Sequence, residues 1–235
     1  MYPNWHQSYL EKDFLMDPYL KVGYSENGED DVIRNFFWED IMDRKECIYL
    51  DIGCFREDMF SNTKLLSLMG WRGIVLDANP DLSESWIKAR KNDIFINRCI
   101  KRNDDEEQSM NFYRFDHRSC STSSLERAKK LVIHGYEMMD IIKVESITLK
   151  ELGKLSIELI KNDIDFISID LEYLDYLIDL PDFIRITKPR LFCMEKIDPY
   201  INIMNIMHSD EVRTLSKVDY QPISLIGENI FFSPI

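Results

Sequence analysis

The sequence predicts an α/β fold with a doubly wound, mostly parallel sheet and helices on both faces. Short apolar runs alternate with amphipathic segments along most of the 235 residues, which is the rhythm of βαβ units. The apolar runs are nearly uninterrupted, as in strands that are covered on both faces. Several runs end in an acidic residue. We expect one domain over residues 1–235, with 1–23 as an N-terminal extension and about 101–147 as an insert.

The composition argues against several classes of protein. Hydrophobic residues make up 45% of the chain, which is enough to bury a core. The formal net charge of −13 argues against a nucleic-acid partner or a membrane surface, because both are polyanions. No run reaches the about 18 apolar residues of a membrane span, and the first 20 residues lack the apolar centre of a signal peptide. We therefore expect a cytoplasmic protein of unspecified oligomeric state.

The cysteines are expected to pack in the core. They lie far apart, without a Cys-x-x-Cys pair or a paired histidine, so they predict neither a zinc site nor a disulfide framework. The five are Cys47, Cys54, Cys99, Cys120 and Cys193.

The first half of the chain predicts three strands and two helices in alternation. The strands are expected at 47–53, 73–77 and 94–97, and the helices at 61–69 and 82–91. Ser61 or Asn62 is the expected N-cap of the first helix, and Gly70 its end. This order is typical of a doubly wound parallel sheet.

The next segment breaks the rhythm and predicts an insert between the third and fourth core strands, placed to cover a substrate pocket. It contains an edge strand at 110–115, a loop at 119–124, a helix at 125–132 and a strand at 141–147. Beyond it we expect a helix capped by Thr148 and ending near 161, the fourth core strand at 165–170, a helix near 174–180, a strand at 190–195 and a closing hairpin at 220–232.

Acidic residues mark the ends of four predicted core strands: Asp51, Asp77, Asp170 and Glu195. In an open α/β sheet, ligands bind outside the carboxyl ends of the strands. Any one of these acids is equally explained by the helix N-terminus that follows it, where a negative charge is favourable. The four together favour a binding site.

The first of these strand ends distinguishes between cofactors. Asp51-Ile52-Gly53 contains one glycine and is not part of the Gly-x-Gly-x-x-Gly run that binds a pyrophosphate. S-adenosylmethionine has no phosphate, and its amino acid and sulfonium groups suit a loop flanked by carboxylates. Asp77 is placed to accept hydrogen bonds from ribose hydroxyls. NAD has the same ribose, so the missing glycine run is what argues against an NAD or nucleotide-sugar enzyme. An ordinary strand-to-helix turn also explains Asp-x-Gly.

The chain resembles the FkbM family of methyltransferases from about residue 22 to the tail at 227–232. The motifs that carry the resemblance are Tyr24–Asp30, Tyr49–Gly53, Ser61–Thr63, Gly70–Pro80 and Ile164–Glu172. The resemblance implies a class I methyltransferase fold, S-adenosylmethionine as cofactor, and O-methylation of a hydroxyl on a sugar or another small-molecule or glycan acceptor.

The same resemblance implies which residues surround the cofactor. The methionine end of the cofactor corresponds to Asp51, Gly53 and Cys54, and the ribose to Asp77, Ala78 and Asn79. The adenine corresponds to Asn97 to Ile100, which include Cys99. The residues that close the pocket are Glu29 and Ser61 to Thr63, which include Asn62.

Asp170 and Glu172 are the predicted catalytic pair. Residues two apart point to the same side if the strand continues to Glu172. Either carboxylate can act as general base, or the pair can hold a divalent cation. A helix-start carboxylate explains Glu172 equally well.

His117 is the alternative base, although a loop histidine is more often a solvated surface residue. Tyr173 stands where the family usually has a glycine. It favours a rival function, in which the fold is kept as a binding module without turnover.

Overall fold

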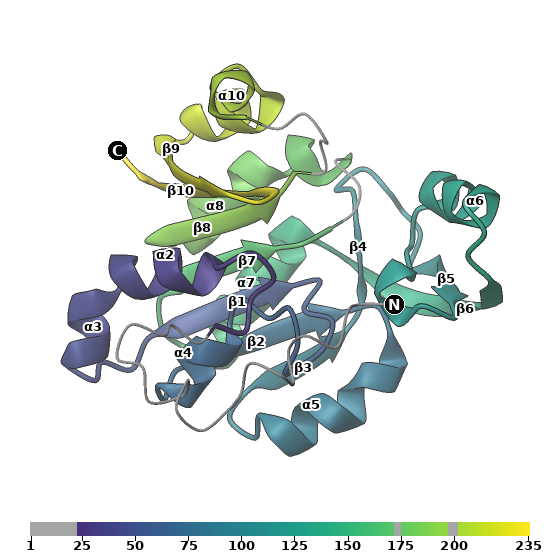
Figure 1. The fold of residues 1–235 in the computed structure, drawn as a ribbon, viewed down its shortest axis with the longest axis horizontal. Coiled ribbons are helices and arrows are strands. Elements are labelled where there is room, and N and C mark those ends of the chain that lie inside the picture. Colours follow the sequence, from purple (N-terminus) through teal and green to yellow (C-terminus); the bar gives the residue numbers. More distant parts are fainter. Residues whose placement is uncertain (1–22, 172–174, 197–201) are drawn as a thin grey trace, which may run out of the picture.

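The fold is a seven-stranded sheet between two layers of helices, with a three-stranded sheet beside it (Figure 1). The structure is a computed structural model that describes residues 23–171, 175–196 and 202–235. The strands are β1 (Ile48–Ile52), β2 (Arg72–Asp77), β3 (Ile94–Asn97), β4 (Cys99–Lys101), β5 (Ser109–Phe115), β6 (Met138–Thr148), β7 (Phe166–Ile169), β8 (Leu191–Glu195), β9 (Tyr220–Ile226) and β10 (Asn229–Pro234). The α-helices are α2 (Glu29–Phe36), α3 (Trp38–Met42), α4 (Lys64–Leu68), α5 (Ser83–Ala89), α6 (Leu125–Ile133), α7 (Leu149–Ile160), α8 (Leu180–Thr187), α9 (Ile203–Ile206) and α10 (Asp210–Ser216). The 3-10 turns are η2 (Pro80–Leu82), η3 (Arg118–Cys120) and η4 (Asp175–Ile178).

The strand order of the large sheet is β3-β2-β1-β7-β8-β10-β9. From β3 to β8 every neighbouring pair is parallel, and β10 is antiparallel to both β8 and β9. The chain therefore winds outward from β1 to β3 and then returns to β7 on the other side of β1. This reversal confirms the predicted doubly wound sheet. It also defines the point between β1 and β7 where such sheets bind ligands.

The two faces of the sheet are covered by different helices, as β1 shows most directly. Ile48, Leu50 and Ile52 point to the core that α7, α8 and α10 cover. Tyr49 points to the opposite core, together with residues of α2, α4 and α5. Alternate side chains of a strand face opposite ways, so a run of five buried residues is explained by cover on both sides. The prediction of helices on both faces is confirmed.

The predicted insert lies between β3 and β7 in the sequence and supplies β5 and nearly all of β6 to the three-stranded sheet, whose order is β4-β6-β5; β4 begins at Cys99, just before the predicted insert. β5 pairs antiparallel with β6, and β4 pairs parallel with it. Tyr113, Phe115, Ala128 and Leu131 form a small core between this sheet and α6. β6 has 11 residues, so it begins earlier than the strand predicted at 141–147.

The segment before α2 contacts the β9–β10 turn. A Cβ on Gly227 would lie 2.6 Å from the Asn27 amide nitrogen. Asn229 donates a hydrogen bond of 2.8 Å from Nδ2 to Oε1 of Glu29, 200 residues earlier. The last hairpin therefore closes against the segment that leads into α2. Neither α2 nor α3 was predicted from the sequence.

The predicted N-cap of the helix at 61–69 is wrong, because the candidate side chains bond elsewhere. α4 begins at Lys64, and Thr63 occupies the N-cap position without a side-chain cap. Ser61 accepts a hydrogen bond from Arg90, and Asn62 donates one to Ser168. These polar groups tie the loop to its neighbours instead of capping the helix.

The helix predicted near 174–180 corresponds in part to the 3-10 turn η4 (Asp175–Ile178), and the α-helix α8 follows it, from Leu180 to Thr187. Pro181 lies in its first turn, where a proline is tolerated because the first N–H groups have no helical partner. The fourth core strand ends at Ile169. The strand continuation that was to align Asp170 with Glu172 is therefore wrong, and Glu172 and Tyr173 lie outside the described residues.

The expectations for Thr148 and for the cysteines are confirmed. Thr148 caps α7 in a reciprocal arrangement with Glu151. All five cysteines are free, and four of them are buried. Among the helices that the structure describes, none is both long and apolar enough to cross a membrane.

Candidate functional site

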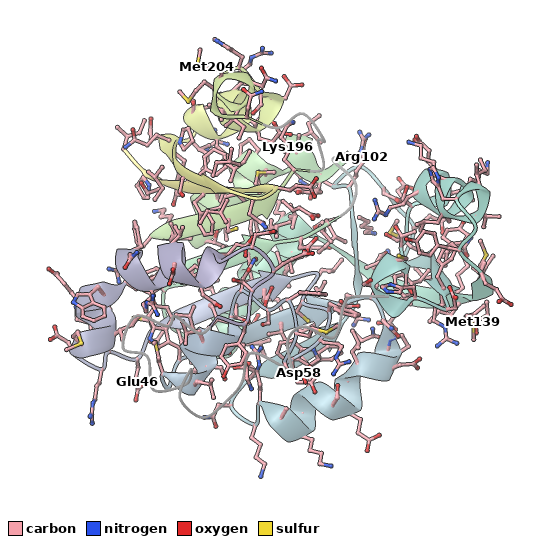
Figure 2. All side chains as sticks on the ribbon, in the orientation of Figure 1. Glu46, Asp58, Arg102, Met139, Lys196 and Met204 are labelled. Carbon is pink, nitrogen blue, oxygen red and sulfur yellow. The ribbon has the colours of Figure 1, made fainter. Side chains whose placement is uncertain are left out.

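A cavity of about 1510 Å³ lies at the carboxyl ends of the core strands, next to the reversal of strand order. Its walls come from the loop after β1, the ends of β2 and β8, the residues just after β7, the β9–β10 turn and the insert. Figure 2 shows the side chains of these elements, with Asp58 in the loop after β1 and Met139 in the insert. The cavity exceeds the about 300–1,000 Å³ of a typical small-ligand pocket.

Gly53 allows two strand ends to approach each other beneath this cavity. Its φ is 81°, in the left-handed region that favours glycine. A Cβ at this position would lie 1.9 Å from the carbonyl oxygen of Asp170. Both residues line the cavity. The single glycine of the Asp-x-Gly motif is therefore required by the close contact between the β1 loop and the residue after β7.

Asp77 presents a carboxylate of fixed orientation to the cavity. Its Oδ2 accepts a hydrogen bond of 2.9 Å from the Phe55 N–H, and its Oδ1 accepts one of 2.7 Å from the Asn79 N–H. A carboxylate oxygen has two lone pairs, so each oxygen can accept another hydrogen bond. Burial raises the pKa of Asp77 to about 6, against the opposing effect of the two backbone hydrogen bonds. Above that pH the group is an acceptor only.

Asp51 lies behind the cavity wall and is 4% exposed. Its Oδ2 accepts a hydrogen bond of 2.6 Å from the Thr63 hydroxyl. Burial raises the pKa of Asp51 to about 6, although the Thr63 hydrogen bond and the charge of Arg90 act in the other direction. Asp51 is therefore a supporting charge, one layer away from the cavity surface.

Arg90, which follows α5, is a buried cation that holds the loop after β1 (54–63). Its Nη1 donates to Thr63 Oγ1 at 2.9 Å, its Nη2 to Ser61 Oγ at 2.8 Å, and its Nε to the Glu57 carbonyl at 3.1 Å. The guanidinium lies 4.3 Å from the centre of the Trp86 ring. We call this set of contacts the Arg90 clamp. Thr63 connects the clamp to Asp51.

The clamp stabilises strained backbone in the cavity wall. Phe55 and Phe60 have φ values of 43° and 55°, and each such residue costs on the order of 1–3 kcal/mol. The Trp86 indole N–H donates to the Phe55 carbonyl at 2.7 Å. Sequence reasoning missed this role of Arg90. The available signal was that Trp86 and Arg90 are four residues apart, on one side of a predicted helix.

The residues predicted to bind the cofactor divide into two groups. Gly53, Asp77, Ala78, Asn79 and Cys99 line the cavity. The others in the described chain are not among its lining residues: Glu29, Asp51, Cys54, Ser61, Asn62 and Asn97.

Members of this second group hold the walls. Asn97 donates to the Asp77 carbonyl at 2.9 Å, and Glu29 accepts a hydrogen bond of 2.8 Å from the Asn27 N–H.

Of the predicted catalytic residues, Asp170 and His117 both line the cavity. Glu172 lies outside the described residues. His117 is exposed, and its Nδ1 is 2.8 Å from the Ser119 hydroxyl. Glu195, which was predicted as a strand-end acid, also lines the cavity. Within the described residues, no group of three His, Cys, Asp or Glu side chains is arranged to bind a metal ion.

Four carboxylates of the cavity lining were missed: Glu26, Glu57, Asp81 and Glu228. Glu26 and Glu228 line the cavity next to Glu195. The pKa of Glu26 is raised by burial and by the charges of Glu29, Glu195 and Glu228. Glu26 precedes α2 and Glu228 lies in a hairpin turn, so neither follows a parallel strand, the signal by which the other acids were found.

The buried carboxylate of Asp51 predicts a pH-dependent stability. Its pKa is higher in the folded protein than its ordinary value, so the folded state binds the proton more tightly. The resulting stability is present at low pH and is lost as pH rises through about 6. Asp51→Asn keeps the shape and the acceptor for Thr63 without the charge. At pH 8 we expect the free energy of unfolding of the variant to exceed that of the wild type by about 1–3 kcal/mol, and its melting temperature to be higher accordingly. Near pH 4 this difference should disappear.

Thermal denaturation at pH 4 and pH 8 measures the effect. Asp104→Asn is the matched control, because its side chain is 70% exposed, and it should leave the pH dependence unchanged. A variant less stable than wild type at pH 8 would show that the attraction to Arg90 outweighs the burial of the charge.

Comparison with known proteins identifies the family. The profile described as "Methyltransferase FkbM domain" matches residues 51–221. No curated protein matches the chain. Among solved structures, monomeric WbdD is similar, with 9% sequence identity and a TM-score of 0.46, over 95% of this chain and 44% of that one. The chain thus spans less than half the length of WbdD. An O-methyltransferase from Bacillus cereus, solved in complex with SAH, shows 14% identity and a TM-score of 0.40, over 97% of this chain and 90% of that one.

The family match and the strand order agree with each other. The matched segment runs from the strand end at Asp51 to the start of β9 and covers most of the chain. The class I methyltransferase fold implied by the sequence motifs is the observed one, with β10 as its antiparallel strand. The chain belongs to the FkbM methyltransferase family.

Proposed function

We propose that the protein transfers the methyl group of S-adenosylmethionine to a hydroxyl of a sugar or another small-molecule or glycan acceptor. One observation carries the proposal. The Asp77 carboxylate faces the cavity with both oxygens fixed by backbone N–H groups. This is the geometry that a pair of ribose hydroxyls requires, since each oxygen has a lone pair left to accept one hydroxyl.

The other residues of the cavity fit the same cofactor. Gly53 brings the backbone to the cavity floor where a side chain would collide with Asp170. Asp170, Glu195 and Glu26 surround the space with carboxylates, which favour a cation such as a sulfonium. A cavity of about 1510 Å³ leaves room for an acceptor beside the cofactor.

When bound, the cofactor supplies a methyl group activated by its positive sulfur. The protein must then orient the acceptor and remove the proton of its hydroxyl. We assign the removal of this proton to the carboxylate of Asp170, which lines the cavity next to Gly53. His117 and Glu172 are the alternative acceptors of the proton. His117 lines the same cavity from the insert.

Calorimetric titration with S-adenosylmethionine and S-adenosylhomocysteine tests the proposal. We expect saturable binding by the wild type and a loss of more than about tenfold in affinity for Asp77→Ala, because two hydrogen bonds to a charged acceptor are removed. Asp77→Asn, which keeps the side-chain volume, should lose affinity in the same direction.

Asp58→Asn is the matched control for this experiment. It removes a carboxylate from the same loop, but that carboxylate is about half exposed and pairs with Arg56. Its affinity should equal that of the wild type. No binding of either compound by the wild type would overturn the proposal. Binding without methyl transfer to any hydroxyl acceptor would instead favour the non-catalytic module.

A further inference from the structure

The insert contributes one continuous wall of the cavity, and its chemistry differs from that of the core. Seven of its residues line the space: Phe112, His117, Ser119, Ser121, Thr122, Ser123 and Arg127. We call them the insert wall. Resting on the proposed function, we propose that the insert wall binds an anionic group, a phosphate ester or a carboxylate, of a polyhydroxylated acceptor.

Charge is segregated across the cavity. The rest of the lining contains seven carboxylates and two arginines, Arg56 and Arg98, so acidic groups outnumber basic ones there; the carboxylates are Glu26, Glu57, Asp77, Asp81, Asp170, Glu195 and Glu228. The insert has nine acidic residues between 101 and 147. All nine are described, and none of them lines the cavity. In a chain with a net charge of −13, this wall is the side on which an anion meets the least repulsion.

Two hydroxyls of the insert wall are arranged as donors. The Ser121 Oγ accepts a hydrogen bond of 3.2 Å from the Phe115 N–H. The Thr122 Oγ1 accepts one of 3.1 Å from the Ser124 N–H. Each hydroxyl oxygen thus has one acceptor position occupied, and its own O–H remains to be directed at a ligand oxygen.

The backbone holds these hydroxyls in place. Thr122 is 4% exposed, and its N–H and carbonyl pair with Tyr113 at 3.1 and 2.8 Å. The strand that carries Tyr113 is itself paired with β6. The donors are therefore fixed before a ligand arrives, which lowers the entropic cost of binding.

Arg127 adds a positive charge to the same wall. Its guanidinium has five N–H donors in a planar fork that matches a phosphate or carboxylate. It can therefore contact a ligand while it keeps another bond. A neutral sugar can accept hydrogen bonds from the Ser121 and Thr122 hydroxyls, but only an anionic sugar is also attracted by the charge of Arg127.

The test uses glucose 6-phosphate, glucuronate and glucose as probes, titrated by calorimetry into protein saturated with S-adenosylhomocysteine. We expect both anionic sugars to bind more tightly than glucose. Arg127→Gln should weaken them by more than about tenfold, as expected for a hydrogen bond to a charged group. The double variant S121A/T122V should weaken them further, and S-adenosylhomocysteine should bind all variants equally.

Lys130→Gln is the matched control. Lys130 lies on the same helix, is 66% exposed and pairs with Glu126, so its variant removes an equal charge that does not face the cavity. Equal binding of glucose and the anionic sugars, or an equal loss in Lys130→Gln, would overturn the inference. A loss of S-adenosylhomocysteine affinity in Arg127→Gln would overturn it too, because the wall would then serve the cofactor. If the wild type fails to bind S-adenosylhomocysteine, the proposed function fails, and the same probes added to the free protein still decide the inference.

Discussion

Gly53→Ala is expected to abolish cofactor binding and to lower the free energy of unfolding by about 2–4 kcal/mol. The added Cβ would lie 1.9 Å from the Asp170 carbonyl oxygen, a backbone atom that cannot rotate away. The φ of 81° adds the strain of a left-handed residue with a side chain. To relieve the contact, the end of β1 must separate from the residues after β7, which alters the floor of the cavity.

Gly135→Ala separates the two causes. Gly135 has a φ of 91°, and a Cβ there meets no atom within 4 Å. This control should cost only about 1 kcal/mol, from the left-handed conformation, and should leave binding of S-adenosylhomocysteine unchanged. Chemical denaturation and calorimetric titration of both variants measure the difference. Equal losses in the two variants would show that backbone conformation, and not the contact with Asp170, sets the requirement for glycine.

Arg90→Met is expected to have an effect of similar size on stability, about 3 kcal/mol, because it leaves buried partners without their cation. Ser61, Thr63 and the Glu57 carbonyl each lose a donor. Methionine keeps apolar contact with Trp86. Because the loop after β1 forms the cavity wall, the KM for S-adenosylmethionine should rise more than tenfold, while the KM for the acceptor stays close to that of the wild type.

The control is Arg190→Met, which removes another arginine with a comparable set of contacts. Arg190 pairs with Asp40 at 2.7 Å and Asp165 at 3.2 Å, and lies 5.0 Å from the Phe37 ring centre. It is positioned just before β8, at the opposite end of the strands. Its variant should lose about 1–2 kcal/mol of stability without a change in either KM. If both variants raise the KM for S-adenosylmethionine equally, the clamp has only a structural role.

The sequence was sufficient to predict the strands that form the site, and the reason is physical. A strand covered on both faces must be apolar along its length, so β1, β2 and β8 appear as short apolar runs. Asp77 and Gly53 were found because they follow such runs. Thr148 was found because a capping box is a local pattern, with both of its partners within four residues.

The remainder depends on contacts between distant segments. Ser61 has the composition of a helix cap, but Arg90, 29 residues later, takes its hydroxyl. Glu228 faces the cavity because a hairpin folds back beside β8, and no local pattern records that return. Thr122 is fixed by a bridge to Tyr113 in a segment that the sequence presents as a loop. The periodicity of apolar residues describes one segment at a time, whereas the partners of Ser61, Glu228 and Thr122 lie in other segments.

The meeting of Asn27 with Gly227 and of Glu29 with Asn229 has a consequence for the newly made chain. A ribosome releases residues in order, so the segment before α2 must wait for almost all later residues before its partner exists. Contacts of such separation in sequence form slowly. The acidic side of the cavity contains Glu26 from the segment before α2 and Glu228 from the β9–β10 turn. We therefore expect this side to assemble late, so that the binding site is completed only in the final stage of folding.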